Sequence, residues 1–225
     1  MDLNDILETF KSLANEANRE GMARFGIKSE TAFGVNIPVL RKMAREIGKD
    51  HTLALQLWEQ PYHEAKLLAT LVADPKQTDS QMMEKWVKDF YSWDICDQCC
   101  GNLFEDTALA YQKAQVWAAR EEEFVRRAGF VMMARLAVSD KKAENQKFEE
   151  FLYLIKTYST DSRNFVKKAV NWALRQIGKR NWALNEKALE AAKEIYSQDN
   201  KTAKWIAADA MRELENDQIR KRIKY

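Results

Sequence analysis

The chain has 225 residues, of which 46% are hydrophobic and 31% are charged, and its formal net charge is +2. This composition excludes an intrinsically disordered chain. A net charge so close to zero does not by itself indicate a nucleic-acid partner. Only seven Gly and three Pro residues are present. Many short strands would need more turn residues than that, so the composition favours helices.

Apolar residues recur at helical spacing along the chain, and no segment shows a strand pattern. The first apolar stripe covers residues 3–14. A second, at 39–44, follows Pro38, which suits a first helical turn. A third follows Pro61 at 65–72, and a fourth follows Pro75 at 82–93. Further helices are expected at 108–119, 124–136, 148–158, 165–177, 184–196 and 203–214, with breaks at 34–36, His51, 74–75, 139–140, Asp161, 179–180 and Ser197.

These helices of roughly ten to sixteen residues, with short connections, pair into units near the length of an armadillo or HEAT repeat. We therefore predict a single all-α domain over residues 1–225. Its HEAT-like helical repeats would stack as a curved α-solenoid with a long concave face. An irregular helical bundle is the alternative, because no strict repeat signature is present.

Secretion and membrane insertion are not indicated. The N-terminus lacks a basic start followed by an apolar core, and no apolar run approaches the roughly 18 residues of a spanning helix. We expect a cytoplasmic protein with no membrane partner.

The three cysteines, Cys96, Cys99 and Cys100, form one cluster. An odd number argues against a disulfide framework. Zinc would need more ligands, and only His51 and His63 could supply imidazoles. We expect buried structural thiols and no metal.

An aromatic ring and a carboxylate stand one helical turn apart at Trp93 and Asp97. At this spacing they share a helix face, and an anionic group beside a π-face is suited to hold a cation. Asp94 is a candidate N-cap for a helix that begins after it, with Ser92 as a competing cap.

The helix expected at 165–178 carries a Trp on its polar face. Lys168, Trp172, Arg175 and Lys179 recur on that face at i, i+4, i+7 and i+11. Cations above and below an aromatic ring suit a DNA phosphate track, and Arg180 extends the basic run. The alternative is a partly buried core Trp with snorkelling Lys and Arg neighbours. The opposite, apolar face is formed by Val166, Ala169, Val170, Ala173 and Ile177.

Charge is distributed unevenly elsewhere. Arg126 and Arg127 are adjacent, so on a helix one would reach the outer surface and the other the inner face. A structural ion pair with a nearby Glu is the alternative use of such a pair. The acidic segment 1–8 and the basic segment 218–225 are compatible with a cationic face or with a simple solvated C-terminal helix.

Four segments, in this order, carry a resemblance to a known family: Phe-Gly-Val-Asn-Ile-Pro at 33–38, Ser-Trp-Asp-x-x-Asp at 92–97, Phe-Val-Arg-Arg-Ala-Gly-Phe-Val at 124–131, and the segment 165–175. The sequence resembles the AlkD-like alkylpurine DNA glycosylases, a HEAT-like-repeat family of DNA alkylation repair proteins. The likeness covers most of the chain from Gly21 onward. The family's N-terminal aromatic near the lesion has no clear match, although Phe33 is a candidate.

The resemblance implies a DNA glycosylase that hydrolyses the N-glycosidic bond of positively charged, N-alkylated purines. The family's catalytic carboxylate falls on Asp97, its two lesion-side Trp residues fall on Trp93 and Trp172, and its phosphate-holding Arg falls on Arg127. The partner would be double-stranded DNA that carries alkylated purines, with no obligate protein partner. The base need not be flipped into a pocket, and no metal or organic cofactor is required.

Two other functions are compatible with the sequence. A noncatalytic HEAT-like module that binds branched or distorted nucleic acid would share the basic face but would not need Asp97. A protein-binding α-solenoid scaffold would need neither the Trp pair nor the basic track.

Overall fold

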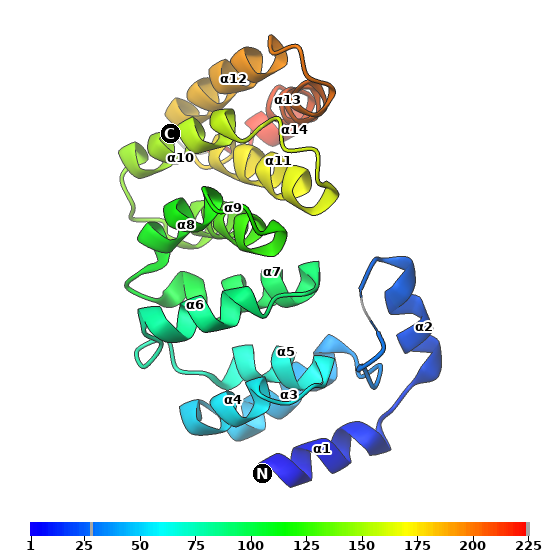
Figure 1. Cartoon of the computed structure of the whole chain (residues 1–225). Coiled ribbons are helices and arrows are strands. Elements are labelled where there is room, and N and C mark those ends of the chain that lie inside the picture. Colours follow the sequence, from blue (N-terminus) through cyan, green and yellow to red (C-terminus); the bar gives the residue numbers. More distant parts are fainter. Residues whose placement is uncertain (28, 224–225) are drawn as a thin grey trace. The chain divides into compact units, whose positions relative to one another are not determined.

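The structure is a computed structural model that describes residues 1–27 and 29–223 (Figure 1). The described residues form α-helices and one 3-10 helix, with no β-strand, which confirms the predicted all-α class. None of the helices in these two ranges is long and apolar enough to cross a membrane. The chain divides into two compact units, Met1–Ala108 and Leu109–Tyr225, here called the N-terminal unit and the C-terminal unit.

The N-terminal unit is organised around α5. Helix α5 packs against α3, α4 and α7. The rings of Trp58 on α4 and Trp86 on α6 stack on each other, with their centroids 4.0 Å apart. The elements are α1 (Leu3–Ser12), α2 (Glu16–Arg24), α3 (Ile37–Ile47), α4 (His51–Trp58), α5 (His63–Val72), α6 (Ser80–Lys88), α7 (Trp93–Asn102) and η1 (Phe104–Asp106).

The C-terminal unit is organised around α9 and α11, which pack against each other along much of their length. Gly129 lets α9 approach α8 closely, because a Cβ at this position would lie 2.3 Å from the backbone nitrogen of Ala118. The elements are α8 (Ala110–Ala118), α9 (Glu123–Ser139), α10 (Asn145–Thr157), α11 (Asn164–Gly178), α12 (Trp182–Tyr196), α13 (Lys201–Leu214) and α14 (Asp217–Arg220).

Local sequence explains where many of the helices begin. Pro38 occupies the first turn of α3, as predicted. Side-chain oxygens cap the N-termini of helices in both units and satisfy otherwise unpaired backbone N–H groups. The capping residues are Asp2, Asn15, Asn36, Asp50, Asp79, Asn181, Asn200 and Asn216. Connections of four residues join α4 to α5, α8 to α9 and α12 to α13, and each pair packs together. Helices joined so tightly run antiparallel.

The structure differs from the sequence prediction at three places in the N-terminal unit. His51 is the first residue of α4 and not a break, because Asp50 caps the helix and Leu53, Ala54 and Leu57 bury its inner face. No helix was predicted at 16–24, where α2 lies. Since α2 buries none of its side chains, it has no apolar stripe to detect. The stripe at 82–93 is also divided, between α6 and α7.

Candidate functional site

Trp93 and Asp97 both lie on α7, one helical turn apart, as the sequence predicts. Both side chains are partly exposed. The indole Nε1 of Trp93 donates a hydrogen bond to the backbone oxygen of Phe25, at 2.9 Å. That bond fixes the edge of the ring, so the aromatic surface that accompanies Asp97 has a defined orientation.

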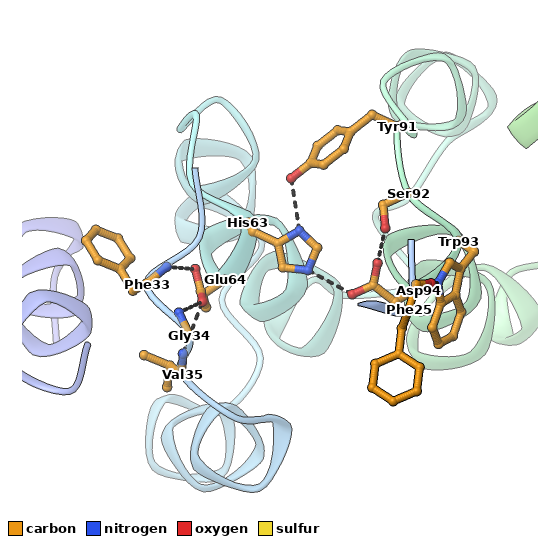
Figure 2. A network of polar contacts seen from close by, with 10 residues as sticks. All are labelled: Phe25, Phe33, Gly34, Val35, His63, Glu64, Tyr91, Ser92, Trp93 and Asp94. Atoms are coloured by element: carbon orange, nitrogen blue, oxygen red, sulfur yellow. Dashed lines mark hydrogen bonds and ion pairs between the residues drawn. The ribbon is translucent and has the colours of Figure 1, made fainter. Parts of the chain in front are cut away.

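The start of α7 is fastened by a chain of polar contacts (Figure 2). Asp94 Oδ2 lies 2.8 Å from Nε2 of His63, the first residue of α5. Ser92 Oγ donates to the other carboxylate oxygen of Asp94. On the far side of the imidazole, the Tyr91 hydroxyl lies 3.0 Å from Nδ1 of His63. These contacts join the N-termini of two helices and therefore position the helix that carries Trp93 and Asp97.

Asp94 is not the N-cap of a helix, contrary to the prediction from the sequence. Asp94 lies inside the first turn of α7, and Ser92 occupies the N-cap position without a side-chain capping hydrogen bond. The reason is competition, because Ser92 Oγ and the Asp94 carboxylate bond to each other and Asp94 also binds His63. The side chains of Ser92 and Asp94 therefore bond to each other and to His63, and they do not cap backbone N–H groups of α7 as the sequence rule predicts.

Ionisation in this network follows from burial and partners. Burial acts to raise the pKa of Asp94, but the hydrogen bonds from His63 and Ser92 outweigh it and hold the pKa below its ordinary value. Asp94 is therefore a carboxylate at neutral pH. Burial raises the pKa of Tyr91 to about 12, so its hydroxyl keeps its proton. Because the Asp94 carboxylate can only accept, the Nε2–H of His63 donates to it.

Glu64 explains the Gly-Val turn at 33–38. Its carboxylate is buried and accepts backbone N–H bonds from Phe33 at 3.0 Å, Gly34 at 2.7 Å and Val35 at 3.1 Å (Figure 2). Gly34 has a φ of +81°, and a Cβ there would lie 2.2 Å from the backbone oxygen of Asn15. The turn thus needs glycine both for its conformation and for its close approach to the chain before α2.

The aromatic residue that contacts Trp93 is Phe25, through its backbone carbonyl, and not Phe33. Phe33 packs against Tyr62, with ring centroids 4.8 Å apart, and against Phe10 at 6.1 Å. Phe25 follows α2, is 72% exposed, and offers its carbonyl to Trp93. Phe25 was not predicted from the sequence, because its contact with Trp93 joins residues 68 positions apart. The only signal was a Phe directly before a Gly in a polar segment.

In the C-terminal unit, Arg127 lies on α9 and is buried. Its Nη1 donates to the backbone oxygen of Phe165, in the first turn of α11, at 2.6 Å. Arg126 pairs with Asp161 at 2.8 Å and lies over the ring of Tyr158. Burial acts to raise the pKa of Asp161, but hydrogen bonds from arginines lower it to about 2. The sequence offered a structural ion pair with a nearby Glu as one use of Arg126 and Arg127. Arg126 forms such a pair, and its partner is Asp161.

The face of α11 that carries Trp172 is the polar one, as predicted. Trp172 is partly exposed and Lys168 is exposed, while the five predicted apolar positions of α11 are all buried. Arg175 and Lys179 are partly buried and both bind Glu213 of α13, Lys179 at 2.6 Å. Burial acts to raise the pKa of Glu213, but its hydrogen bonds to Lys179 and Arg175 lower it. A phosphate that binds here competes with an ionised carboxylate.

Arg180 bonds to backbone carbonyl groups and packs on an aromatic ring within the C-terminal unit. Its guanidinium donates to the backbone oxygens of Ala137 at 3.2 Å and Ala143 at 2.9 Å, and it lies 4.3 Å from the ring centroid of Phe148. These bonds satisfy carbonyl groups near the end of α9 and before α10. A contact from Arg180 to DNA remains a prediction. It would use guanidinium N–H groups other than the two that bond to the Ala137 and Ala143 carbonyls.

All three cysteines are buried on α7 without forming a disulfide. Burial raises the pKa of Cys99 well above its ordinary value, which makes it a poor nucleophile. Over residues 1–27 and 29–223, no group of His, Cys, Asp and Glu side chains is arranged to hold a metal ion.

Comparisons with known proteins agree with this architecture. Among the curated proteins no match is found. A solved structure described as "A new family of proteins related to the HEAT-like repeat DNA glycosylases with affinity for branched DNA structures" has a TM-score of 0.82 and 24% sequence identity, over 100% of this chain and 97% of that chain. This likeness confirms the predicted HEAT-like fold. A model of the family "DNA alkylation repair enzyme" matches residues 6–214. Since that match covers most of the sequence, the chain belongs to the DNA alkylation repair enzyme family.

Proposed function

We propose that this protein is a DNA glycosylase of alkylation repair that hydrolyses the N-glycosidic bond of positively charged, N-alkylated purines in DNA. The observation that carries the proposal is the N-terminal half of α7, where Trp93 and Asp97 lie one turn apart on a helix whose start is held by the His63–Asp94 contact. The proposed place of action is the cytoplasm, on double-stranded DNA.

The chemistry suits a carboxylate without a strong general acid. An N-alkylated purine already carries positive charge, so it leaves as a neutral base when the bond to the sugar breaks. Positive charge then develops on the deoxyribose. Asp97 stabilises that charge and orients a water, which adds to the anomeric carbon and loses its proton. The π-face of Trp93 adds attraction to the same developing cation.

The C-terminal unit supplies DNA contacts in this proposal. Arg127 lies against the first turn of α11, where its Nη1 donates to the Phe165 carbonyl, and in the proposal its guanidinium holds a phosphate oxygen of the DNA. Trp172 packs against the sugar-phosphate backbone of the DNA, and Lys168 is the exposed cation next to it on α11. Arg175, Lys179 and Arg180 extend the phosphate track when DNA phosphates displace their present partners, which are Glu213 and backbone carbonyls. In the N-terminal unit, Phe25 takes the place of the family's N-terminal aromatic.

A noncatalytic module that binds branched DNA is the second candidate. It is favoured by the description of the similar solved structure, which names affinity for branched DNA structures. It would use the cations of α11 and would have no need of a charge at Asp97.

The deciding experiment is single-turnover release of base from a duplex that carries one 7-methylguanine. We expect wild-type protein to release the base, and Asp97→Asn to slow release by about 10²–10³ while DNA affinity is kept. Asp106→Asn is the matched control, since Asp106 is an exposed Asp of the same unit. Wild-type protein that binds the duplex and never releases base supports the noncatalytic module. Release at the wild-type rate by Asp97→Asn removes Asp97 from the mechanism.

A further inference from the structure

Helix α2 stands over a cavity in the N-terminal unit. None of its side chains is buried, so it adds nothing to the core. It is held near its start by backbone and side-chain bonds from Asn15 and Asn18 to the 33–34 turn, at 2.8 and 3.0 Å. Just after its end, the Phe25 carbonyl accepts the indole N–H of Trp93. Helix α2 is thus held by hydrogen bonds near both ends, buries no side chain, and covers one side of the cavity.

The cavity has a volume of about 440 Å³. Gly21 and Met22 line it from α2, and Ile37 and Leu67 line it from α3 and α5. Its polar side chains include Asp94 and His63. A mostly apolar cavity of this size with a few convergent polar groups is the usual form of a small-molecule site.

The polar groups of this cavity differ in what they still offer a ligand. Both ring nitrogens of His63 are engaged, by Tyr91 and Asp94. Asp94 accepts hydrogen bonds from His63 and Ser92, one on each oxygen, and a backbone hydrogen bond from Ile95, whereas a carboxylate can accept about four. Since Asp94 stays ionised, it presents a charged acceptor at an apolar wall. The complementary ligand is a flat, apolar ring with N–H donors along one edge.

We propose that this cavity binds one purine base, with Asp94 accepting N–H bonds from the edge of the ring. The identity of the ring as a purine rests on the proposed function. Since the resemblance implies excision without rotation of the base into a pocket, the expected source is a base set free by hydrolysis. A base of the DNA that has rotated out of the helix has the same chemistry and is the alternative outcome of the test. Phe25, which also lines the cavity, adds an aromatic surface on the side of Trp93.

Gly21 provides a clean test, because a Cβ built there meets nothing within 4 Å. Gly21→Phe fills the cavity from its roof, whereas Gly21→Ala adds only a methyl group to the same helix. The probe is 2-aminopurine, a fluorescent purine, added as the free base to the full chain. We expect saturable fluorescence quenching by wild type and Gly21→Ala, and none by Gly21→Phe with unchanged helix content. Asp94→Asn should weaken binding about tenfold through loss of a charged acceptor.

The second arm places 2-aminopurine inside a duplex. Fluorescence that depends on protein, and is lost in Gly21→Phe at equal DNA affinity, assigns the cavity to a rotated base. Binding of the free base alone assigns it to released product. The purine site is overturned if wild-type protein leaves the free base unquenched, or if Gly21→Phe binds it as tightly as wild type. Binding needs no catalysis, so a protein that binds 2-aminopurine but releases no 7-methylguanine contradicts only the glycosylase.

Discussion

Nε2 of His63 and Oδ2 of Asp94 lie 2.8 Å apart and join the first residue of α5 to the first turn of α7. The imidazole is buried, and 14% of the Asp94 side chain is exposed. The next residues toward the C-terminus of α7 bring Asp97 to the surface. A contact in the interior of the unit therefore sets the position of the proposed catalytic carboxylate.

The contact makes stability depend on pH in a defined direction. Because hydrogen bonds from His63 and Ser92 lower the pKa of Asp94, the folded state favours the ionised carboxylate. Its contribution is present above the ordinary Asp pKa of about 3.9 and is lost as pH falls through the lower folded value. We expect Asp94→Asn to cost about 1–3 kcal/mol at pH 7. Urea unfolding of both proteins should show this difference shrinking below pH 4.

A difference between wild type and Asp94→Asn that stays constant down to acid pH would mean that the charge of Asp94 is not what stabilises the unit. Asp106→Asn, at an exposed position, should leave unfolding unchanged at neutral pH.

Glu64 should be the most sensitive carboxylate of the N-terminal unit. It is 1% exposed and accepts three backbone N–H bonds. Glu64→Gln keeps the shape but turns an NH₂ group toward backbone donors, so we expect a loss of about 3 kcal/mol or more. Hydrogen exchange should speed up at Gly34 and Val35 first. Glu59→Gln is the control, since Glu59 forms an exposed pair with Lys85, worth about 0–1 kcal/mol. Equal effects of the two changes would contradict the role of Glu64.

Two helical glycines should respond oppositely to alanine. Gly129→Ala places a Cβ 2.3 Å from the backbone of Ala118 and should force α8 and α9 apart, at a cost of about 1–3 kcal/mol. Gly21→Ala meets nothing and should stabilise α2 by up to about 1 kcal/mol. Thermal unfolding of both variants measures the contrast. A Gly129→Ala protein as stable as wild type would show that α8 can shift without loss.

The sequence predicted most of the helices that have a buried apolar face. It missed the short helix α4, although that helix buries four residues, and it missed α2 and α14, which bury none. The apolar face of α11 repeats at helical spacing, and all of its predicted core positions are buried. By contrast, α2 buries nothing and is held by bonds to the 33–34 turn. Local periodicity carries no information about such tertiary bonds.

The same division applies to the candidate site. The Trp93–Asp97 spacing was predictable because it lies within one helix. The His63–Asp94 contact joins residues 31 positions apart, and a capping rule pointed Asp94 at its own backbone instead. Glu64 did leave a signal, as a carboxylate in a helix that is otherwise largely apolar and buried. A buried Glu needs partners, and here they are the amides of a glycine turn far earlier in the chain.

Glu213 should restrain DNA binding by the C-terminal unit. It holds both Arg175 and Lys179, so a phosphate must displace a carboxylate to reach either cation. Glu213→Gln removes that competing charge, and we expect tighter duplex binding with a steeper salt dependence, by about one phosphate contact in slope. Lys168→Ala should weaken binding, because this exposed cation needs no release. Fluorescence anisotropy of a labelled duplex across a salt series measures both. Glu215→Gln, an exposed acid just beyond α13, controls for the change in net charge. If Glu215→Gln strengthens binding as much as Glu213→Gln does, the gain comes from overall charge, and Arg175 and Lys179 do not contact DNA.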